Sequence, residues 1–213
     1  MTGFLDLPAT ADAALADKHA MRRRIRAERA ARPAAERLRL AEHLVDVAAE
    51  TPQLHRVECV ALYASMPGEP GTAPLRAWLR ERGVRVLLPV VSSEGLRWAV
   101  DDGDLAAAPA GTPGGATPRT PAGPPEDLRL AQVVLVPALA VDTLGRRLGQ
   151  GGGFYDRSLR HAHPAALVAA VVHDAELLDA AVEPVPTQPH DHLVSAALTP
   201  SRWRLLDAVV DLP

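Results

Sequence analysis

The sequence predicts an α/β protein with a mostly parallel sheet that helices cover on both faces. Short, largely apolar runs recur at 57–64, 84–91, 132–141 and 166–172, and strands that are buried on both faces have this composition. Helical patterns separate these runs, and such alternation is typical of a parallel sheet. With 213 residues the chain can build one sizeable core and is short for two domains. We therefore expect a single domain over residues 1–213.

The elements expected in the first half of the chain follow from apolar periodicity and from helix start and stop signals. They are a loose tail at 1–10, helices at 11–32, 33–50 and 73–83, and strands at 57–64, 84–91 and 96–100. Pro33 ends one helix and opens the next. Thr72 is expected to cap the third helix, which Gly83 ends.

The middle and second half of the chain contain an unusual segment and then further strands. Residues 101–127 are rich in proline, glycine, alanine and threonine. We interpret them as one long loop, and a structureless loop of this length is either functional or a linker. The elements expected after it are strands at 132–141, 166–172 and 193–198, helices at 154–162 and 173–182, and a proline-rich loop at 184–191.

The stretch GRRLGQGGGFYDRSL, residues 145–159, follows the strand at 132–141. Ligands of open α/β sheets bind at the carboxyl ends of strands, and this stretch lies at such an end. Glycines allow backbone N–H groups to converge on an anion, and Arg146 and Arg147 can add positive charge. The spacing matches neither a P-loop nor a dinucleotide-binding fingerprint. A glycine-rich turn without a ligand is the simpler alternative.

A second basic element lies near the start of the chain. Lys18, Arg22 and Arg26 are four residues apart and share one helix face, where like charges repel unless an anion offsets them. Lys18 is the only lysine in the chain, which makes it a candidate for a site that needs a compact ammonium. The commoner alternative is a solvated basic face. An RNA- or membrane-binding arm is a third, but the segment has no interleaved aromatic residues for stacking.

The composition argues against several classes of protein. A net charge of −3 argues against a general nucleic-acid-binding protein, though not against a local basic site. The single cysteine, Cys59, fits a reducing compartment. The N-terminus does not have the pattern of a signal peptide, and no apolar stretch approaches the length of a membrane span. We expect a cytoplasmic monomer that binds neither nucleic acid nor membranes.

The stretch from Gly145 to Leu159, with VVLVPALAVD before it, closely resembles the signature of the 5-formyltetrahydrofolate cyclo-ligase, or methenyltetrahydrofolate synthetase, family. That signature is a strand ending in Val-Pro-Gly, followed by Gly-x-Arg-Leu-Gly-x-Gly-x-Gly-Tyr-Tyr-Asp. Weaker matches follow in the family's order over residues 18–199. They are Lys18 and Arg22 (Lys-x-x-x-Arg), Glu69 and Thr72 (Glu-x-x-Thr), VLLPVV, His190-Asp191 and Thr199.

The resemblance implies a three-layer α/β sandwich and an ATP-dependent ring closure. The family converts 5-formyltetrahydrofolate to the methenyl form with magnesium, and releases ADP and phosphate. The formyl oxygen attacks the γ-phosphate, the neighbouring folate nitrogen attacks the activated carbon, and phosphate leaves. This chemistry needs positioning and charge neutralisation more than a protein nucleophile.

The resemblance also implies a role for each matched residue. Lys18 and Arg147 are the expected catalytic residues, and both would hold ATP phosphates. Glu69 would accept hydrogen bonds from the pterin N–H groups, and Asp156 and Asp191 would hold magnesium directly or through water. The set expected to bind ATP is Lys18, Arg22, Arg147, Leu148, Gly149, Gln150, Gly151, Gly152, Gly153, Phe154 and Tyr155. The set expected to bind the folate is Glu69, Gln150 and Phe154.

Structural roles remain open for some of these residues. Asp156 could be a first-turn helix acid, Asp191 a loop cap and Glu69 an exposed turn residue, while Phe154 and Tyr155 could belong to the core. The run His190-Asp191-His192 lacks the further ligands of a zinc site.

Several positions depart from the family pattern. Gln150 replaces an aromatic or basic residue, Phe154 a tyrosine and Glu176 the usual glutamine. The other departures are Ala138, Gly71, Ser195 and the segment around Gly115–Pro118. They are more numerous on the folate side than on the ATP side. The alternative function is therefore a family relative without folate turnover that acts as a nucleotide- or RNA-binding module.

Overall fold

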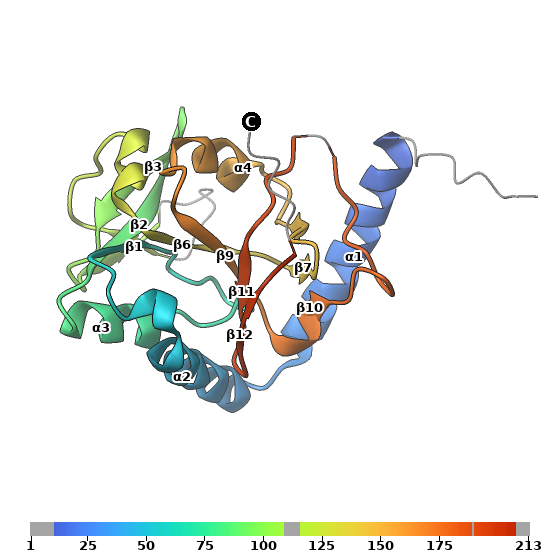
Figure 1. Ribbon diagram of the computed structural model, residues 1–213, viewed down its shortest axis with the longest axis horizontal. Coiled ribbons are helices and arrows are strands. Elements are labelled where there is room, and N and C mark those ends of the chain that lie inside the picture. Colours follow the sequence, from blue (N-terminus) through green and yellow to red (C-terminus); the bar gives the residue numbers. More distant parts are fainter. Residues whose placement is uncertain (1–10, 109–115, 189, 208–213) are drawn as a thin grey trace, which may run out of the picture.

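A seven-stranded sheet forms the centre of the computed structural model, which describes residues 11–108, 116–188 and 190–207. The strand order is β12-β11-β9-β6-β1-β2-β3 (Figure 1). The inner strands are parallel: β1 (Cys59–Ala61), β2 (Arg85–Ser92), β6 (Val133–Pro137), β9 (Leu167–Val171) and β11 (Ala196–Leu198). The edge strands β3 (Gly95–Val100) and β12 (Trp203–Leu205) are antiparallel. The predicted mostly parallel sheet is confirmed.

Helices cover both faces of this sheet, as the sequence predicts. On one face lie α2 (Ala34–Glu50), α3 (Ala73–Glu81) and the short 3-10 helix Pro52–Leu54. On the other lie α4 (Phe154–Ser158) and two 3-10 helices, η2 (Pro125–Leu130) and η3 (Leu159–His161) (Figure 1). Successive strand residues point to opposite layers, because Val60 packs with the first set and Ala61 with the second. The result is a three-layer sandwich.

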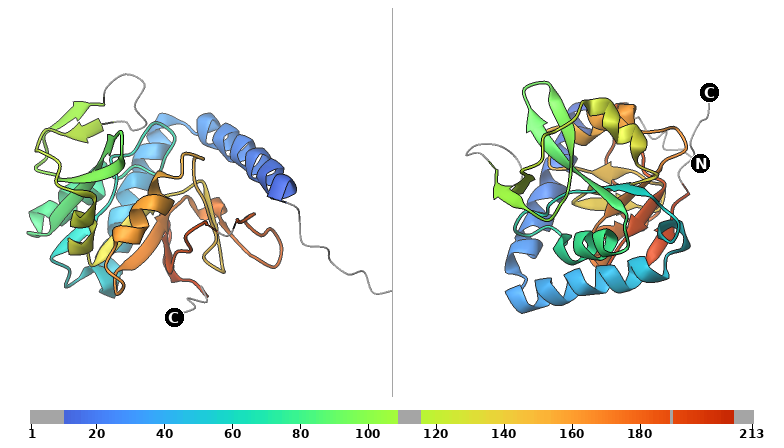
Figure 2. Two further views of the ribbon diagram at one scale, coloured as in Figure 1. Left: turned by 90° about the horizontal axis from the view of Figure 1, so that it is seen from above. Right: turned by 90° about the vertical axis from the view of Figure 1, so that its left-hand side faces the viewer.

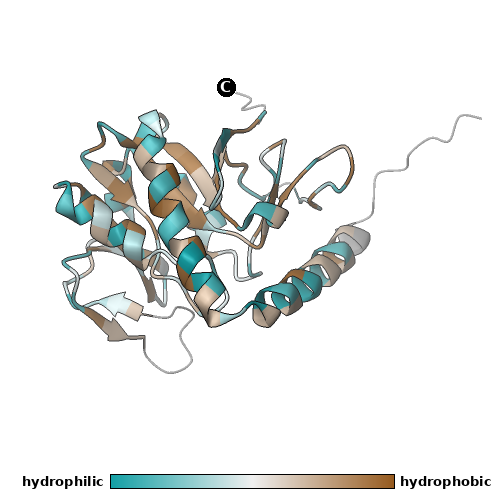
Figure 3. Ribbon diagram, turned by 90° about the horizontal axis from the view of Figure 1, so that it is seen from below, coloured by the Kyte–Doolittle hydropathy of each residue, from teal (hydrophilic) through white to brown (hydrophobic). Residues whose placement is uncertain are grey.

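A small second sheet lies beside the main one and carries α1 (Ala11–Ala31). Its order is β10 (Leu177–Leu178), β7 (Ala140–Asp142) and β8 (Arg147–Leu148). The helix α1 projects beyond the body of the molecule and is largely hydrophilic (Figures 2 and 3). Ile25 is its one fully buried apolar residue among the described side chains, in a cluster with Leu139 and Leu148. Polar contacts must therefore supply much of what holds α1 in place.

The chain changes direction across the sheet between β1 and β6. From β1 it passes through α3 to β2 on one side, whereas β6, β9 and β11 continue on the other. Loops that leave the carboxyl ends of two such strands diverge, and the space between them is the usual ligand site of an open α/β sheet.

One predicted strand, 132–141, is wrong as a single element. It forms β6 in the main sheet and β7 in the second sheet, and the chain crosses between them at Ala138. The Leu139 N–H donates to the Leu148 carbonyl at 2.7 Å. The residues after Leu139 therefore pair with β8 in the second sheet. All these residues are apolar, so no change of periodicity indicates the crossing.

The helix predicted at 173–182 is also wrong. Residues Asp174–Glu176 form a 3-10 helix, η4, and Leu177–Leu178 then pair with β7 as strand β10. Sheet pairing has overridden helical propensity there. The helix predicted at 154–162 is α4 followed by η3. The strands at 57–64 and 193–198 are only three residues each, and β12 was not predicted.

The segment 101–127 is not the structureless loop that its composition predicts. Its strands β4 (Leu105–Ala107) and β5 (Ala116–Pro118) form an antiparallel pair, and η2 begins at its end. Residues 109–115 and the tail 1–10 lie outside the described residues. Thr72 precedes α3 as expected but does not cap it, because its hydroxyl donates to the Tyr63 carbonyl at 2.6 Å.

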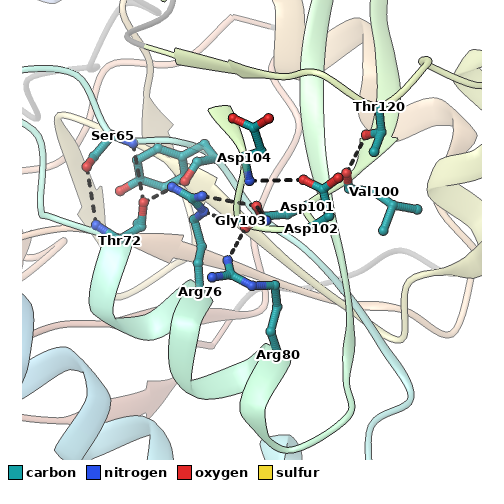
Figure 4. A network of polar contacts seen from close by, with 11 residues as sticks. Ser65, Thr72, Arg76, Arg80, Val100, Asp101, Asp102, Gly103, Asp104 and Thr120 are labelled. Atoms are coloured by element: carbon teal, nitrogen blue, oxygen red, sulfur yellow. Dashed lines mark hydrogen bonds and ion pairs between the residues drawn. The ribbon is translucent and has the colours of Figure 1, made fainter. Parts of the chain in front are cut away.

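Figure 4 shows what fastens the start of this segment to α3. Arg76 donates from Nε and Nη2 to the Asp101 carboxylate at 2.8 and 3.1 Å, and Arg80 donates to the same carboxylate at 2.8 Å. Asp101 also accepts the Gly103 N–H at 3.0 Å. The side chain of Asp101 is fully buried, so these contacts attach the start of the segment to α3.

Among the described residues, no helix is both long and apolar enough to cross a membrane.

Candidate active site

A cavity of about 680 Å³ opens where the chain changes direction across the sheet. Tyr63 and Ala64, which follow β1, line it, as do Pro137 at the end of β6 and Pro89 to Val91 near the end of β2. These are the carboxyl ends of three neighbouring parallel strands. The helix α1 and the glycine-rich loop at 149–153 form the opposite wall.

Every residue of the expected catalytic, ATP-binding, folate-binding and magnesium-binding sets lines this one cavity, whereas Arg146, also expected to add charge to the loop, pairs with Asp142 outside it. From α1 come Lys18 and Arg22, and from the loop before α3 comes Glu69. The remaining members are Arg147, Leu148, Gly149, Gln150, Gly151, Gly152, Gly153, Phe154, Tyr155, Asp156 and Asp191. Their chemical roles stay predictions, but segments as far apart as 18 and 191 meet here. Lysine and arginine side chains in the lining outnumber carboxylates five to three, so the cavity favours an anion.

The glycine-rich loop offers hydrogen-bond donors to the cavity. None of the backbone N–H groups of residues 149–153 donates to an acceptor among the described residues. Several of the loop's carbonyls are occupied: Arg22 Nε donates to the Gly149 carbonyl at 2.9 Å, and Arg26 Nη2 to the Gln150 carbonyl at 3.1 Å. The carbonyls are therefore held away while the N–H groups stay available, which is the arrangement of an anion nest.

Gly153 fixes the direction in which the loop leaves the cavity. Its φ of 63° and ψ of 12° lie in the left-handed region, and α4 begins at the next residue. A Cβ at this position would also lie 2.9 Å from Nη1 of Arg157. Only glycine enters this conformation without cost.

Two buried cations flank the loop, and each is paired with a carboxylate. Lys18 Nζ, 4% exposed, donates to Asp191 Oδ2 at 2.5 Å and to Gln188 Oε1 at 3.2 Å. Arg147 Nη2 donates to Asp156 Oδ1 at 2.6 Å, and its buried Nε has no partner among the described residues. The two expected catalytic cations and the two expected magnesium ligands thus form cation–carboxylate pairs.

The same carboxylates retain capacity for a cation. The hydrogen bonds to Asp156 reach Oδ1, and those to Asp191 reach Oδ2. The other oxygen of each carboxylate accepts no hydrogen bond from the described residues. No group of three or more His, Cys, Asp or Glu side chains in the described part of the chain forms a metal site by itself. Two carboxylates suit Mg²⁺ only when phosphate and water oxygens complete its shell.

Glu69 lines the cavity and is 8% exposed. Burial raises its pKa, while the Met66 N–H, the charge of Arg29 and the Gln150 amide act in the opposite direction. The Met66 N–H donates to Glu69 Oε2 at 2.9 Å. Burial also raises the pKa of Tyr155, and the nearby Glu69 adds to that rise. Glu69 therefore faces a neutral phenol, and it could accept N–H donors from a ligand.

The aromatic pair at 154–155 does not behave as one unit. Tyr155 packs against the main core cluster, as its structural alternative predicts, and still lines the cavity. Phe154 lies on the cavity wall, with the Arg157 guanidinium 5.2 Å from its ring centre. A flat ligand could therefore contact Phe154 from the cavity side.

The sequence analysis gave two residues of the site no specific role: Arg26, which it placed only in the basic row of the helix, and Gln188. Arg26 donates to the Gln150 side-chain oxygen at 2.7 Å and so holds the side chain that lies between the loop and Glu69. Its signal was present, because it continues the four-residue spacing of Lys18 and Arg22. Gln188, a partner of Lys18, lies in the proline-rich loop and had no signal of its own.

Comparison with known proteins gives a consistent match. The model of the 5-formyltetrahydrofolate cyclo-ligase family matches residues 14–200. A 5-formyltetrahydrofolate cyclo-ligase from Mycolicibacterium smegmatis is 45% identical over 150 residues, which cover 67% of this chain and 74% of that protein. The Escherichia coli protein of the same name is 31% identical over 154 residues, covering 71% and 82%.

Solved structures agree with these relatives. The NMR structure of Aquifex aeolicus 5,10-methenyltetrahydrofolate synthetase superposes with a TM-score of 0.73 at 26% identity, covering 92% of this chain and 96% of that one. A Mycoplasma pneumoniae 5,10-methenyltetrahydrofolate synthetase has a TM-score of 0.65 at 19% identity and shows the same fold.

Proposed function

Because the chain belongs to the 5-formyltetrahydrofolate cyclo-ligase family, we propose that this ligase converts 5-formyltetrahydrofolate to 5,10-methenyltetrahydrofolate with ATP and Mg²⁺, releasing ADP and phosphate. The observation that carries the proposal is the set of free N–H groups at 149–153, flanked by Lys18 and Arg147. Donors and cations gathered in one cavity suit a triphosphate. We also infer that the protein is cytoplasmic, in line with its single cysteine, and that it acts as a monomer.

In the proposed reaction the formyl oxygen attacks the γ-phosphorus and ADP leaves. The folate N10 then attacks the formyl carbon and gives up its proton, and the former formyl oxygen departs in the phosphate. Each step moves negative charge between phosphate oxygens. Lys18 and Arg147 would neutralise that charge, and the loop N–H groups would hold the phosphates in line. Arg22 would keep the loop in place through the Gly149 carbonyl.

Asp156 and Asp191 are the proposed magnesium ligands. Magnesium would neutralise phosphate charge when it is bound. The oxygen of each carboxylate that accepts no hydrogen bond would approach it, although Oδ1 of Asp191 also lies 3.8 Å from Nε2 of His190. Phosphates would then replace the carboxylates as partners of Lys18 and Arg147, so the site exchanges one set of ion pairs for another.

Glu69, Gln150 and Phe154 are proposed to bind the folate. A pterin presents N–H donors along one edge, and a buried carboxylate accepts them well. Phe154 would contact a flat face of the folate, and Gln150, held by Arg26, would lie between nucleotide and pterin.

No observation favours the alternative of an RNA-binding module. Arg22 and Arg26 donate to the glycine-rich loop, Arg24 pairs with Glu183, and Arg29 is buried. Four of the five arginines behind this alternative are therefore engaged within the protein, and the fifth, Arg23, lines the cavity.

The test is an absorbance assay for the methenyl product. Purified protein is mixed with 5-formyltetrahydrofolate and Mg-ATP, with and without ATP. We expect ATP-dependent product from the wild type and none from Arg147→Ala. Arg76→Ala is the matched control, because it removes another buried arginine paired with an aspartate, outside the cavity. It should lower stability and keep turnover.

Two results would contradict the proposal. Normal turnover in Arg147→Ala would remove Arg147 from the reaction. Absence of product from a wild type that still binds Mg-ATP in calorimetry would mean that the nucleotide site is right and the substrate is different.

A further inference from the structure

A buried ion pair lies beside Glu69 and takes no part in the proposed reaction. Arg29 is 3% exposed and Glu176 is 4% exposed. Arg29 donates from Nε and Nη2 to the two carboxylate oxygens of Glu176, both at 2.7 Å, and from Nη2 to the Ala138 carbonyl at 2.6 Å. The His173 N–H donates to Glu176 Oε2 at 2.8 Å. The guanidinium is thus held in one orientation from two sides.

One edge of that guanidinium remains free. Nη1 of Arg29 is buried and has no hydrogen-bond partner among the described residues. Arg29 packs against the loop that carries Glu69, because a Cβ added at Gly68 would lie 3.9 Å from the Cβ of Arg29. A buried, positively charged group with an unused donor therefore lies next to a buried carboxylate.

The other groups that face Glu69 are neutral. Tyr63, which follows β1, and Tyr155 of α4 both surround it, and burial raises the pKa of each phenol, with the Glu69 charge adding to the rise. The Gln150 amide and the Met66 N–H are uncharged. Among the described residues, Arg29 is the cation that faces Glu69. Glu176, the partner of Arg29, is the second carboxylate near these residues.

We propose that Arg29 is a positioning residue for substrate binding: its guanidinium, fixed by Glu176 and the Ala138 carbonyl, is the buried positive charge that keeps Glu69 ionised in the free site. This rests on the proposed function, in which Glu69 accepts the pterin N–H donors. A protonated Glu69 would offer a hydrogen where the pterin also offers one, and the contact would be lost.

Glu176 moderates this effect. Its negative charge offsets part of the field of Arg29, since the two form a bidentate pair. Glu176→Gln would keep a hydrogen-bond acceptor there but would leave the Arg29 charge uncompensated. Glu69 should then ionise more readily. Removal of both charges should make Glu69 ionise less readily than in the wild type.

The experiment compares wild type, Glu176→Gln and the double variant Arg29→Gln/Glu176→Gln. Glu176→Gln keeps an amide oxygen to which Arg29 can donate, and the double variant removes both charges of the pair, so neither leaves Glu176 buried without its cation. The carboxyl titration of Glu69 is followed by NMR in protein labelled with ¹³C-glutamate and free of ligand, and Glu69→Gln identifies the signal. The titration midpoint should rise in the order Glu176→Gln, wild type, double variant. Arg76→Gln/Asp101→Asn removes a similar buried pair elsewhere (Figure 4) and should leave the midpoint unchanged.

Kinetics then connect the charge to the substrate. On the acid side of the pH profile, KM for 5-formyltetrahydrofolate should be about tenfold higher in the double variant than in Glu176→Gln, as one unit of titration shift would give. The Kd for Mg-ADP should be the same in both variants. A purely structural role of Arg29 would not raise KM for the folate while leaving nucleotide affinity unchanged.

Equal Glu69 midpoints in Glu176→Gln and the double variant would overturn the proposal, whether or not the protein turns over folate. So would a Glu176→Gln midpoint at or above that of the wild type, which needs only the single variant to fold. If the order holds and no variant binds 5-formyltetrahydrofolate, the charge effect stands and the proposed function fails.

Discussion

Lys18 shows how much of the site depends on one side chain. It is the only lysine in the chain, it is buried, and its ammonium lies between Asp191 and Gln188. The longer, planar guanidinium of Lys18→Arg would not fit this compact arrangement. We expect turnover to fall by roughly 100-fold, as for loss of one transition-state donor.

The control for this substitution is Arg24→Lys, on the same helix, where the side chain is exposed and pairs with Glu183 and Glu28. It should keep kcat/KM unchanged. Activity in Lys18→Arg close to that of wild type would show that position 18 needs only a positive charge.

Gly153 allows a test of the loop conformation. Gly153→Ala would place a side chain at a φ of 63°, which costs about 1–2 kcal/mol, and would displace Arg157. Gly83→Ala has a similar φ of 78° at the end of α3, with nothing within 4 Å of the added Cβ. We expect both to lower the free energy of unfolding in urea, and only Gly153→Ala to weaken Mg-ADP binding in calorimetry. Equal Mg-ADP affinities in the two variants would mean that nucleotide binding does not depend on the loop conformation at Gly153.

At the scale of elements, Asp142 holds the β7–β8 turn that leads into the loop. Its buried carboxylate accepts the N–H groups of Leu144, Arg146 and Val185 at 3.0, 3.1 and 2.9 Å, and the Arg146 side chain at 2.6 Å. Asp142→Ala should cost about 3 kcal/mol, as loss of a buried, charged hydrogen-bond partner does. Because β8 carries Arg147, Mg-ADP binding should weaken as well.

Asp101→Ala is the matched comparison, since Asp101 is equally buried and also accepts from two arginines. Urea unfolding should show a loss of similar size. Calorimetry should show unchanged Mg-ADP affinity, because neither Asp101 nor its arginine partners line the cavity. A nucleotide effect of equal size in both variants would mean that general loosening, and not the β7–β8 turn, is responsible.

The elements that could be predicted are those whose local signal agrees with their tertiary role. The helices α1 and α2 and the strand β2 lie within a few residues of their expected bounds, because periodicity and stop signals coincide there. The second sheet could not be predicted. Its strands β10 and β8 are two residues each, so they exist only through pairing with β7, and no local pattern of residues 177–178 indicates that partner.

At the scale of the whole molecule, the set of residues that lines the cavity was easier to predict than the bounds of the elements around it, while the roles of these residues stay predictions. The glycine-rich motif is specific, and its distant partners were found through the family's order of matches rather than through any local property. What could not be predicted is how these residues contact one another, such as Lys18 with Gln188 or Arg29 with Glu176. Such pairs depend on which elements the fold brings together, and single-chain patterns carry no information on that.

One buried base should make the stability of the whole fold sensitive to mild acid. Burial, with the charges of Arg32 and Arg29, lowers the pKa of His173 from 6.5 to about 3. Neither of its ring nitrogens has a hydrogen-bond partner among the described residues. As pH falls below 6.5 the unfolded chain takes up a proton that the folded protein cannot hold. Stability should therefore fall by up to about 1.4 kcal/mol per pH unit until pH 3 is approached.

His173→Leu tests this, because leucine has a similar size and no ring nitrogen hydrogen bond is lost. Despite burial, hydrogen bonds to charged and hydroxyl groups hold the pKa of Asp101 and Asp174 below the usual 3.8. The stability that these carboxylates contribute is therefore lost only as pH falls below that value. Both proteins contain Asp101 and Asp174, so the contribution of these groups cancels when the unfolding free energy of the wild type is subtracted from that of the variant. Both free energies are measured in urea between pH 6 and 4.5. That difference should grow in favour of the variant as pH falls. A constant difference would mean that His173 accepts its proton in the folded state, and that the interior around Glu176 tolerates a second cation beside Arg29.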